Sequence, residues 1–397
     1  MAYTEKTVMS WGSRIGSSFK GVMAALLLLA GGSFFLWNNE ERSILTGDAI
    51  VEAQLATVEL PDVSKVDPTF NGKMVHATGF ADTKDVITDS IFGVKTTAIK
   101  LERKAEYYQW VESSKSETRQ KLGGGTETVT TYTYKQDWAR EPVDSSEFHD
   151  PLYRGKNTVL TTVPNETVYA ENVTFGVYRL PPFIRNAISG TVPVSIDLTS
   201  GDIADLSRQS GFGYRITETE GSYVHVQNST IYLGRSPVSP QNGDIRMTFT
   251  EVRPTEISIL AQVIGDTFEP FRASNGNTFS RTTMGTVGAK NMFGSAVSGN
   301  KTTTWLFRLL GALIVCAAFR MLMAPLSVLA ALIPILGTIV GAGTSIVAFL
   351  LGFTWSLLVV AIAWLRFRPV IGGSLLAASA VLLALLYAKG RKNKIST

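Results

Sequence analysis

Residues 321–365 read MLMAPLSVLAALIPILGTIVGAGTSIVAFLLGFTWSLLVVAIAWL, a run of 45 positions without one charged side chain. A soluble domain has no use for so long an uncharged run, whereas a helix needs only about 20 apolar residues to cross a bilayer. Two further uncharged runs, 21–39 and 369–388, each have the length of one span. The sequence therefore predicts an integral, multi-pass membrane protein, and the lipid bilayer is its first expected partner.

Residues 40–301, between these runs, are polar and show the β-branched and aromatic alternation that is typical of strands. The candidate strands are 97–101, 107–111, 128–134, 223–227, 230–233, 244–249 and 256–264. Turns are expected at 123–125, 242–243 and 265–266, and short helices at 182–188 and 202–209. We expect a large, mainly antiparallel β domain with short helices, and an α+β membrane protein overall.

Charge flanking the apolar runs predicts their orientation. Basic residues precede the first run and follow the last, at Lys6, Arg14, Lys20, Lys389, Arg391, Lys392 and Lys394. The positive-inside rule then places both chain ends in the cytoplasm. The expected organisation is a cytoplasmic N-terminus and retained first transmembrane helix at 1–39, an extracytoplasmic (periplasmic or lumenal) β domain at 40–301, a transmembrane helical bundle at 302–388, and a basic cytoplasmic tail at 389–397.

Three return spans are expected in the C-terminal bundle, at 303–323, 346–365 and 369–388. The intervening segment, around 325–345, is apolar but broken by proline and by several glycines. We interpret it as a re-entrant or interfacial helix on the cytoplasmic side. Gly337 and Gly341 form a G-x-x-x-G step within it, which either lets two helices approach closely or only makes the segment flexible.

Residues expected at the membrane interface are Trp37, Arg308, Arg320, Arg366 and Arg368. Trp37 has the amphipathic ring that this layer favours, and the first two arginines can extend to opposite interfaces. Arg366 and Arg368 fall in a short outer turn, against the positive-inside rule.

Two acidic residues follow the first apolar run directly. Glu40 or Glu41 could pair with Arg308, or could form a solvated stop to the apolar run. We favour the solvated stop.

Aromatic residues gather on one expected hairpin. Tyr107, Tyr108, Trp110 and Trp138 are large rings on neighbouring strands, and Tyr108 and Trp110 share one face. They either form an interaction surface or pack within the sheet, and we favour packing.

Catalytic and metal-binding patterns are scarce. The three histidines, His76, His149 and His225, have no ligand spacing, and the adjacent His149 and Asp150 point apart on a strand. Segment 285–290 lacks the spacing of a phosphate loop. The single cysteine, Cys316, excludes an intrachain disulfide, and a net charge of +4 with no basic tract argues against nucleic-acid binding. We expect no enzyme, metal or cofactor.

Four blocks resemble the transmembrane protein 43 family: AIKLERKAEYYQWVE at 98–112, YTYKQDW at 132–138, GDIRMTF at 243–249 and ILAQVIGDTFEPF at 259–271. The resemblance covers nearly the whole chain. It implies a membrane protein of the endoplasmic reticulum and nuclear inner membrane that oligomerises and organises membrane protein complexes, with partners such as emerin and lamins. Alanine- and glycine-rich C-terminal spans depart from the animal pattern and suit a bacterial member, which would lie in the inner membrane.

The expected function is therefore a non-enzymatic membrane scaffold that forms homo-oligomers and binds other membrane proteins. Lipid binding or lipid handling is an alternative that fits the same apolar features. A transporter or membrane-embedded enzyme is disfavoured, because residues 321–365 lack the ionisable groups that ion sites and proton relays need.

Overall fold

The computed structural model describes residues 2–199, 224–370 and 373–374. The expected short helix at 202–209 and the tail at 389–397 lie outside these residues. So does nearly all of the last expected span, 369–388.

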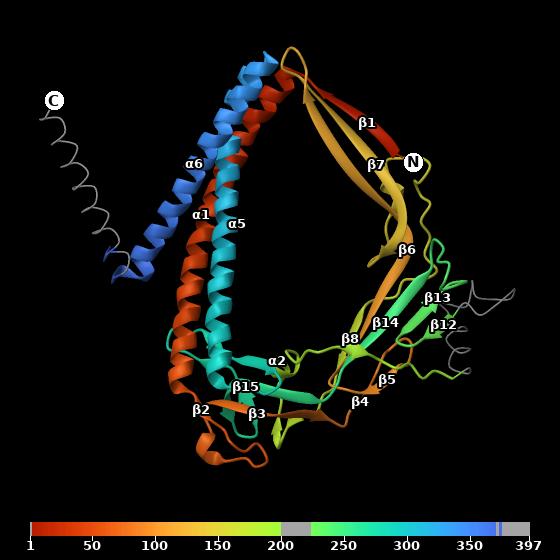
Figure 1. Ribbon diagram of the computed structural model, residues 1–397, viewed down its shortest axis with the longest axis vertical. Coiled ribbons are helices and arrows are strands. Elements are labelled where there is room, and N and C mark those ends of the chain that lie inside the picture. The colour runs from red at the N-terminus through yellow and green to blue at the C-terminus, as the bar shows by residue number, and fades with distance from the viewer. Residues whose placement is uncertain (1, 200–223, 371–372, 375–397) are drawn as a thin grey trace, which may run out of the picture.

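Three long helices form one side of the molecule: α1 (Trp11–Ala56), α5 (Ala289–Ala330) and α6 (Pro334–Phe367) (Figure 1). Each of them, among the described residues, is long and apolar enough to cross a membrane. Helix α1 has 46 residues and is about 69 Å long at 1.5 Å per residue, far more than a bilayer requires. Helices α1 and α5 therefore continue beyond the apolar layer into the β structure.

The expected re-entrant helix around 325–345 is not a separate element. Helix α5 continues through Pro325 to Ala330, the chain turns at 331–333, and α6 starts at Pro334. Proline suits the first turn of a helix, where a backbone N–H has no partner in any case. The breaking residues thus mark a tight turn between two antiparallel helices, and the re-entrant or interfacial placement of this segment in a membrane stays a prediction.

The first sheet has eight strands in the order β1-β7-β6-β14-β13-β12, with β11 beside β14 and β8 beside β6. Its strands are β1 (Ala2–Met9), β6 (Lys100–Gln120), β7 (Thr126–Ala139), β8 (Glu166–Tyr169), β11 (Val192–Pro193), β12 (Val224–Gln227), β13 (Thr230–Leu233) and β14 (Ile245–Val252). All pairings in it are antiparallel.

The second sheet has seven strands in the order β10-β9-β3-β15-β16, with β19 beside β15 and β2 beside β3. Its strands are β2 (Val58–Glu59), β3 (Met74–Thr83), β9 (Val173–Phe175), β10 (Tyr178–Arg179), β15 (Thr255–Ile264), β16 (Thr267–Glu269) and β19 (Arg281–Met284). The β domain also contains two separate two-stranded ribbons and one short helix. These are β4 (Val86–Thr88) with β5 (Lys95–Thr97), β17 (Phe271–Arg272) with β18 (Thr278–Phe279), and α2 (Pro182–Arg185). The predicted mainly antiparallel β domain with short helices is confirmed.

The main core of the β domain lies between the two sheets and includes Tyr107, Phe175, Tyr178, Phe249 and Phe268. A second cluster joins the helices to this domain. In it, Ile50 and Ala53 of α1 and Phe293 of α5 pack against Met74 and Leu260 of the second sheet. Because these contacts are buried and apolar, the helices and the β domain form one continuous body.

The hairpin of β6 and β7 is the longest feature of the β domain, with fourteen paired positions. It arches away from the core to the far end of the helices (Figure 1). There Arg14 donates to the carbonyl oxygen of Gly124, and Trp11 Nε1 donates to the carbonyl oxygen of Val328 at 2.9 Å. The hairpin tip therefore touches the start of α1, which in turn contacts the end of α5.

Strand β1 pairs with β7 along its whole length, from Ala2 opposite Thr133 to Met9 opposite Thr126. Paired strands lie about 4.8 Å apart, so no bilayer of about 30 Å can separate them. The cytoplasmic placement of the N-terminus and the extracytoplasmic placement of 40–301 as a whole stay predictions, and the two cannot both hold for the paired residues 2–9 and 126–133. The pairing adds that residues 126–133 share a compartment with the start of the chain.

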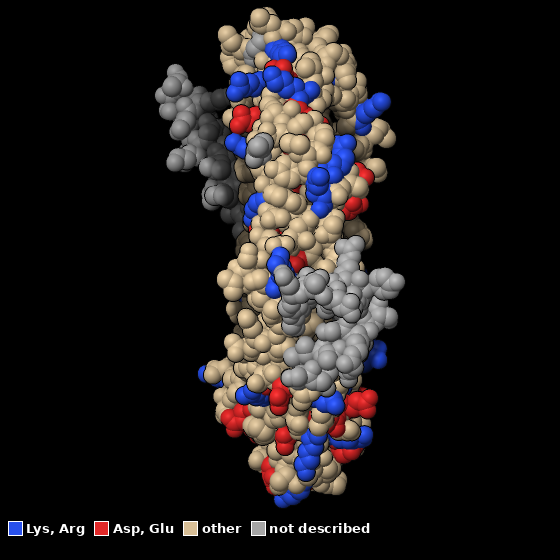
Figure 2. All heavy atoms as spheres, turned by 90° about the vertical axis from the view of Figure 1, so that its right-hand side faces the viewer, with Lys and Arg blue, Asp and Glu red and all other residues tan. Residues whose placement is uncertain are grey.

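The hairpin is polar, whereas the helices on the opposite side of the molecule are apolar. All side chains from Ser113 to Gln120 are exposed, and Lys, Arg, Asp and Glu are spread along this face from one end of the molecule to the other (Figure 2). Exposed large apolar side chains are instead concentrated on the helices, including Leu27, Leu313 and Leu350. Lipid can therefore cover the helical side of the molecule but not the hairpin side.

Candidate functional site

The three long helices meet at a buried ion pair. Glu40 of α1 is 1% exposed, and Arg308 of α5 donates to both of its carboxylate oxygens, each at 2.7 Å. Trp364 of α6 adds a third hydrogen bond, from Nε1 to Glu40 Oε2 at 2.8 Å. We call these three residues the helix junction.

Aromatic rings complete the junction around the arginine. The guanidinium carbon of Arg308 lies 4.7 Å from the ring centre of Trp305 and 5.5 Å from that of Trp364. The charge of a buried arginine is best compensated when its guanidinium donates two hydrogen bonds to one carboxylate and lies over aromatic rings. The interpretation of Glu40 as a solvated stop is therefore wrong, and only its neighbour Glu41 remains partly exposed.

A second polar layer lies on the β-domain side of the junction. Asn39 donates to the carbonyl oxygen of Thr304 at 3.1 Å, and Arg42 donates to Asn39 Oδ1 at 3.1 Å and to Asn300 Oδ1 at 3.2 Å. Asn300 in turn donates to the carbonyl oxygen of Ser43 at 2.8 Å. These contacts bind α1 to α5 at the end of the uncharged run 21–39, where water begins to be available.

A cavity of about 380 Å³ opens beside the junction. Its lining includes the junction residues and the following side chains: Ile44, Asp48, Val51, Val297, Asn300, Lys301, Thr304, Trp305 and Arg368. The cavity thus brings aromatic, cationic and anionic groups together in one recess. Its place at the end of the apolar helices makes it the candidate site.

The other residues expected at the interface are dispersed around this level or far from it. The ring of Trp37 packs on that of Phe367, with 5.3 Å between centres, and Arg366 lies over the same Phe367 ring at 5.9 Å. Arg368 lines the cavity, whereas Arg320 is exposed farther along α5. Their contact with a membrane surface stays a prediction.

The G-x-x-x-G step, Gly337 and Gly341, lies close to the turn between α5 and α6. A side chain at Gly337 would come within 2.7 Å of Ala331 Cα, whereas one at Gly341 would make only an ordinary contact of 3.9 Å with Ser327. The tight helix contacts are elsewhere, at Gly32, Gly311 and Gly352. Sequence spacing could not reveal them, because each faces a helix that is distant in the sequence.

Replacing Gly352 with leucine should destabilise the α5–α6 packing by about 1–3 kcal/mol, the usual cost of overpacking. Its added Cβ would lie 2.6 Å from Cys316 Cα, and this backbone atom cannot move without shifting α5. Gly343→Leu is the matched control, since nothing lies within 4 Å of that position. Thermal unfolding of the detergent-solubilised variants measures the difference, and equal stability would contradict the packing.

The rings of Tyr108, Trp110 and Trp138 are half-buried and pack within the chain. The rings of Tyr108 and Trp138 lie 5.2 Å apart, and those of Trp110 and Tyr153 lie 4.8 Å apart. Arg246 covers Trp138 at 4.2 Å. These contacts support the interpretation that the rings pack within the sheet, and a binding role for them stays a prediction.

The hydroxyl of Tyr134, on β7 of the hairpin, is held by two hydrogen bonds. Its hydroxyl donates to Glu112 Oε2 at 2.6 Å and accepts from the backbone N–H of Asp150 at 2.9 Å. Burial, reinforced by the hydrogen bond to Glu112, raises the pKa of Tyr134 to about 12. Glu112 also accepts from the backbone N–H of His149 at 2.8 Å, so the hydroxyl is part of the contact between hairpin and loop.

The raised pKa of Tyr134 predicts an alkaline transition. The folded state favours the neutral phenol, so its stabilisation is complete below the ordinary pKa of about 10 and is lost as the pH rises from there toward 12. A titration followed by tyrosinate absorbance should show a late-ionising phenol that is missing in Tyr134→Phe. An unchanged titration in that variant would contradict the assignment.

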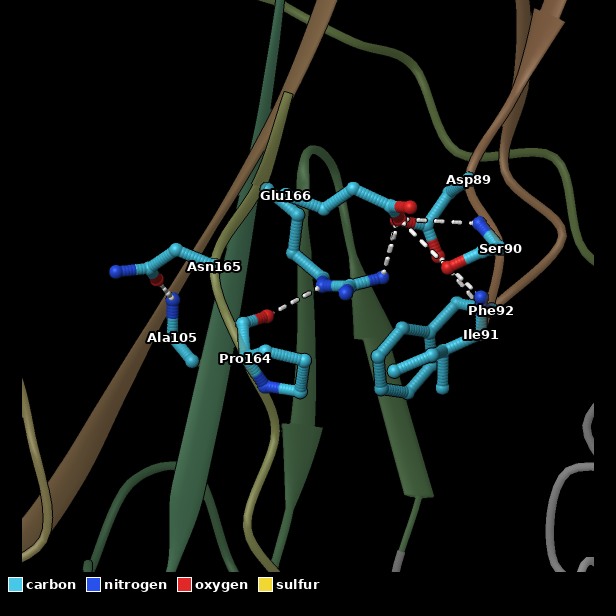
Figure 3. A network of polar contacts seen from close by, with 9 residues as sticks. Asp89, Ser90, Ile91, Phe92, Ala105, Pro164, Asn165 and Glu166 are labelled. Atoms are coloured by element: carbon cyan, nitrogen blue, oxygen red, sulfur yellow. Dashed lines mark hydrogen bonds and ion pairs between the residues drawn. The ribbon is translucent and has the colours of Figure 1, made fainter. Parts of the chain in front are cut away.

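A buried ion cluster lies deeper in the β domain (Figure 3). Arg103 of β6 pairs with Asp89 and, at 3.1 Å, with Glu166 of β8, and its Nε donates to the carbonyl oxygen of Pro164 at 3.1 Å. Burial raises the pKa of Asp89, whose other oxygen accepts from the backbone N–H of Phe92 at 2.7 Å. Every charge is engaged internally, so the cluster is a clamp between strands rather than a reactive site.

Two of the histidines form local contacts. His76 lies between Glu59 Oε2, at 2.6 Å, and the carbonyl oxygen of Val287, at 2.9 Å, while His149 stacks on Tyr132. Within residues 2–199, 224–370 and 373–374, no group of three metal-ligating side chains gathers. The described part of the chain thus offers no arrangement on which a metal-dependent reaction could be argued.

Comparison of the sequence with known proteins identifies relatives of the chain. The family model described as Transmembrane protein 43 matches residues 107–369. Human Transmembrane protein 43 is 27% identical over 387 residues, covering 95% of this chain and 90% of the human protein. The Drosophila melanogaster homolog is 24% identical over 371 residues, covering 90% and 92%. No solved structure gives a significant match to the chain.

Proposed function

Because the chain belongs to the transmembrane protein 43 family, we propose that it is a non-enzymatic membrane scaffold that assembles with copies of itself and holds other membrane proteins. It acts in the bacterial inner membrane if the source is bacterial, and in the endoplasmic reticulum and nuclear inner membrane if it is eukaryotic. The relatives carry no enzymatic name, which agrees with this role.

The observation that carries the proposal is that the polar hairpin extends along the molecule opposite the apolar helices and reaches their far end (Figures 1 and 2). A single copy surrounded by lipid would expose the charged side chains of β6, such as Lys115 and Arg119, at the depth of the apolar helices. A charge at that depth costs several kcal/mol. Copies that turn their hairpins toward one another and their helices toward lipid avoid this cost.

Rigidity supports the scaffold role further. Helices α1 and α5 continue from the apolar segment into the β core, where Ile50 and Phe293 are buried. An interaction surface on the β domain is therefore held at a fixed distance from the helix junction. A flexible tether would not maintain such a distance, whereas a scaffold requires it.

Cross-linking of the full chain in native membranes tests this arrangement. With Cys316 replaced by alanine, a cysteine at Ser114 or at Lys115, which point to opposite faces of β6, should give covalent dimers on at least one face. A cysteine at Leu313, 56% exposed on the lipid side, is the control and should give far fewer. A strict monomer in native mass spectrometry, with no co-purifying protein, would contradict the proposal.

Lipid binding is the second candidate function, favoured by the cavity at the helix junction. A transporter has less support, because the one buried ion pair of the described helices, Glu40 with Arg308, lies at the end of the uncharged run. Ion pathways need such groups at mid-membrane depth.

A further inference from the structure

The cavity beside the helix junction begins where the hydrocarbon layer of the proposed membrane ends. Glu40 immediately follows the uncharged run 21–39, and its partner Arg308 forms the same wall of the cavity from α5. Both charges are compensated within the chain, so this wall can border on lipid. The rest of the cavity extends from it toward the β domain.

The cavity extends from the end of the hydrocarbon layer through the headgroup layer and slightly beyond it. Asp48 is eight residues beyond Glu40 on α1, and Lys301 is seven residues before Arg308 on the antiparallel α5. At 1.5 Å per residue both lie about 10–12 Å farther from the hydrocarbon than the junction. The headgroup region of one leaflet is about 5–8 Å thick. The backbones of Asp48 and Lys301 therefore lie a few Å beyond the headgroup layer, and a headgroup can meet these residues only through the side chains with which they line the cavity.

Three charged side chains around the cavity have no partner. The side chains of Asp48, Lys301 and Arg368 line it, are exposed, and form no hydrogen bond or ion pair with any described residue. This contrasts with the saturated contacts of Glu40 and Arg308. The guanidinium of Arg368 and the ammonium of Lys301 are the two groups that proteins use to bind phosphate oxygens, and the carboxylate of Asp48 suits an ammonium group.

The remaining wall is apolar and aromatic. Trp305, 67% exposed, and Trp364 border the cavity together with Val51 and Val297. Indole rings prefer the membrane interface because they combine an apolar body with one polar N–H. Gly47 contributes no side chain, so the recess stays open along α1.

We propose that this cavity binds the headgroup of a zwitterionic phospholipid, of which phosphatidylethanolamine has the fitting groups. The phosphodiester lies between Lys301 and Arg368, the primary ammonium pairs with Asp48, and the glycerol end rests on Trp305 at the lipid side. The volume of about 380 Å³ falls within the range of small-ligand pockets. The inference rests on the membrane placement in the proposed function and is independent of self-assembly.

Native mass spectrometry of the full-length protein, released from detergent micelles with added phosphatidylethanolamine, tests it. The double variant Lys301→Gln/Arg368→Gln should bind this lipid about tenfold more weakly, because a hydrogen bond to a charged group is worth about that factor. Arg366→Gln is the matched control, since Arg366 lies two residues from Arg368 but packs on Phe367 outside the cavity. The control should bind the lipid as the unaltered protein does.

Two competition arms identify the recognised group. Diacylglycerol, which lacks the phosphodiester, should not displace the phospholipid, and inorganic phosphate should not displace it at equal concentration. Asp48→Asn should reduce the preference for phosphatidylethanolamine over phosphatidylglycerol. Equal lipid retention by the double variant, or full displacement by inorganic phosphate, would overturn the inference. The same spectra report the oligomeric state, so a failure of the scaffold proposal remains distinguishable.

Discussion

Replacing Glu40 with alanine is expected to lower the free energy of unfolding by about 3–5 kcal/mol, the largest effect of any single change at the helix junction. The substitution removes both acceptors of the Arg308 guanidinium and the acceptor of Trp364 Nε1. Arg308 is only 18% exposed, so its charge would remain largely buried without compensation. Chemical unfolding in detergent micelles measures the loss.

Glu41→Ala is the matched control, because it changes the next residue of the same helix without touching the junction. Its effect should stay within about 0.5 kcal/mol, as for most exposed substitutions. Replacing Glu40 and Arg308 together by leucine should recover most of the stability, since an apolar pair needs no compensation. Equal effects of Glu40→Ala and Glu41→Ala would contradict the buried pair.

Replacing Gly176 with alanine should destabilise the β domain by about 2–5 kcal/mol. Its φ of 63° lies in the left-handed region, which costs an L residue about 1–2 kcal/mol. The added Cβ would also overlap the backbone carbonyl oxygen of Val63, and overpacking adds about 1–3 kcal/mol. Thermal unfolding of the solubilised chain, followed through the circular dichroism signal of its β structure, measures the combined effect.

Gly155→Ala separates the two contributions to this loss. Gly155 has nearly the same φ, 67°, but nothing lies within 4 Å of the position that an added Cβ would take, so only the conformational cost applies. The difference between the two variants is the cost of the steric overlap. If Gly155→Ala is as destabilising as Gly176→Ala, the close approach to Val63 is not present.

The three long helices and the β domain were predictable because their signals are local. The uncharged runs at 21–39 and 346–365 have the length of single spans, and alternation marks strands such as 128–134 and 256–264. Such patterns depend on neighbouring residues and on elementary geometry. The α5–α6 turn was not predictable in the same way, because proline and glycine indicate a break without showing whether the chain reverses there.

The helix junction could not be predicted with the same certainty, because it joins Glu40 to a residue 268 positions away. A carboxylate after an apolar run is usually solvated, and only the antiparallel packing of α1 and α5 shows that this one is buried. Strand β1 and its pairing with β7 could not be predicted from the sequence for the same reason. Residues 2–9 carry Lys6 and Glu5 and suggest only a polar terminus, yet their partners lie in β7.

The most direct test of the account is a disulfide between β1 and β7. The polar hairpin runs opposite the membrane helices to the end where α1 begins, and its pairing with β1 makes Thr4 and Thr131 register partners. Partnered Cα atoms lie about 4.5–5.5 Å apart, within reach of a disulfide. With Cys316 replaced by alanine, cysteines at these two positions should oxidise to an intramolecular bond in native membranes, whereas Thr4 with Thr118 of β6 should not. Labelling of the two cysteines by an impermeant maleimide from opposite sides of the membrane, with no disulfide, would contradict it.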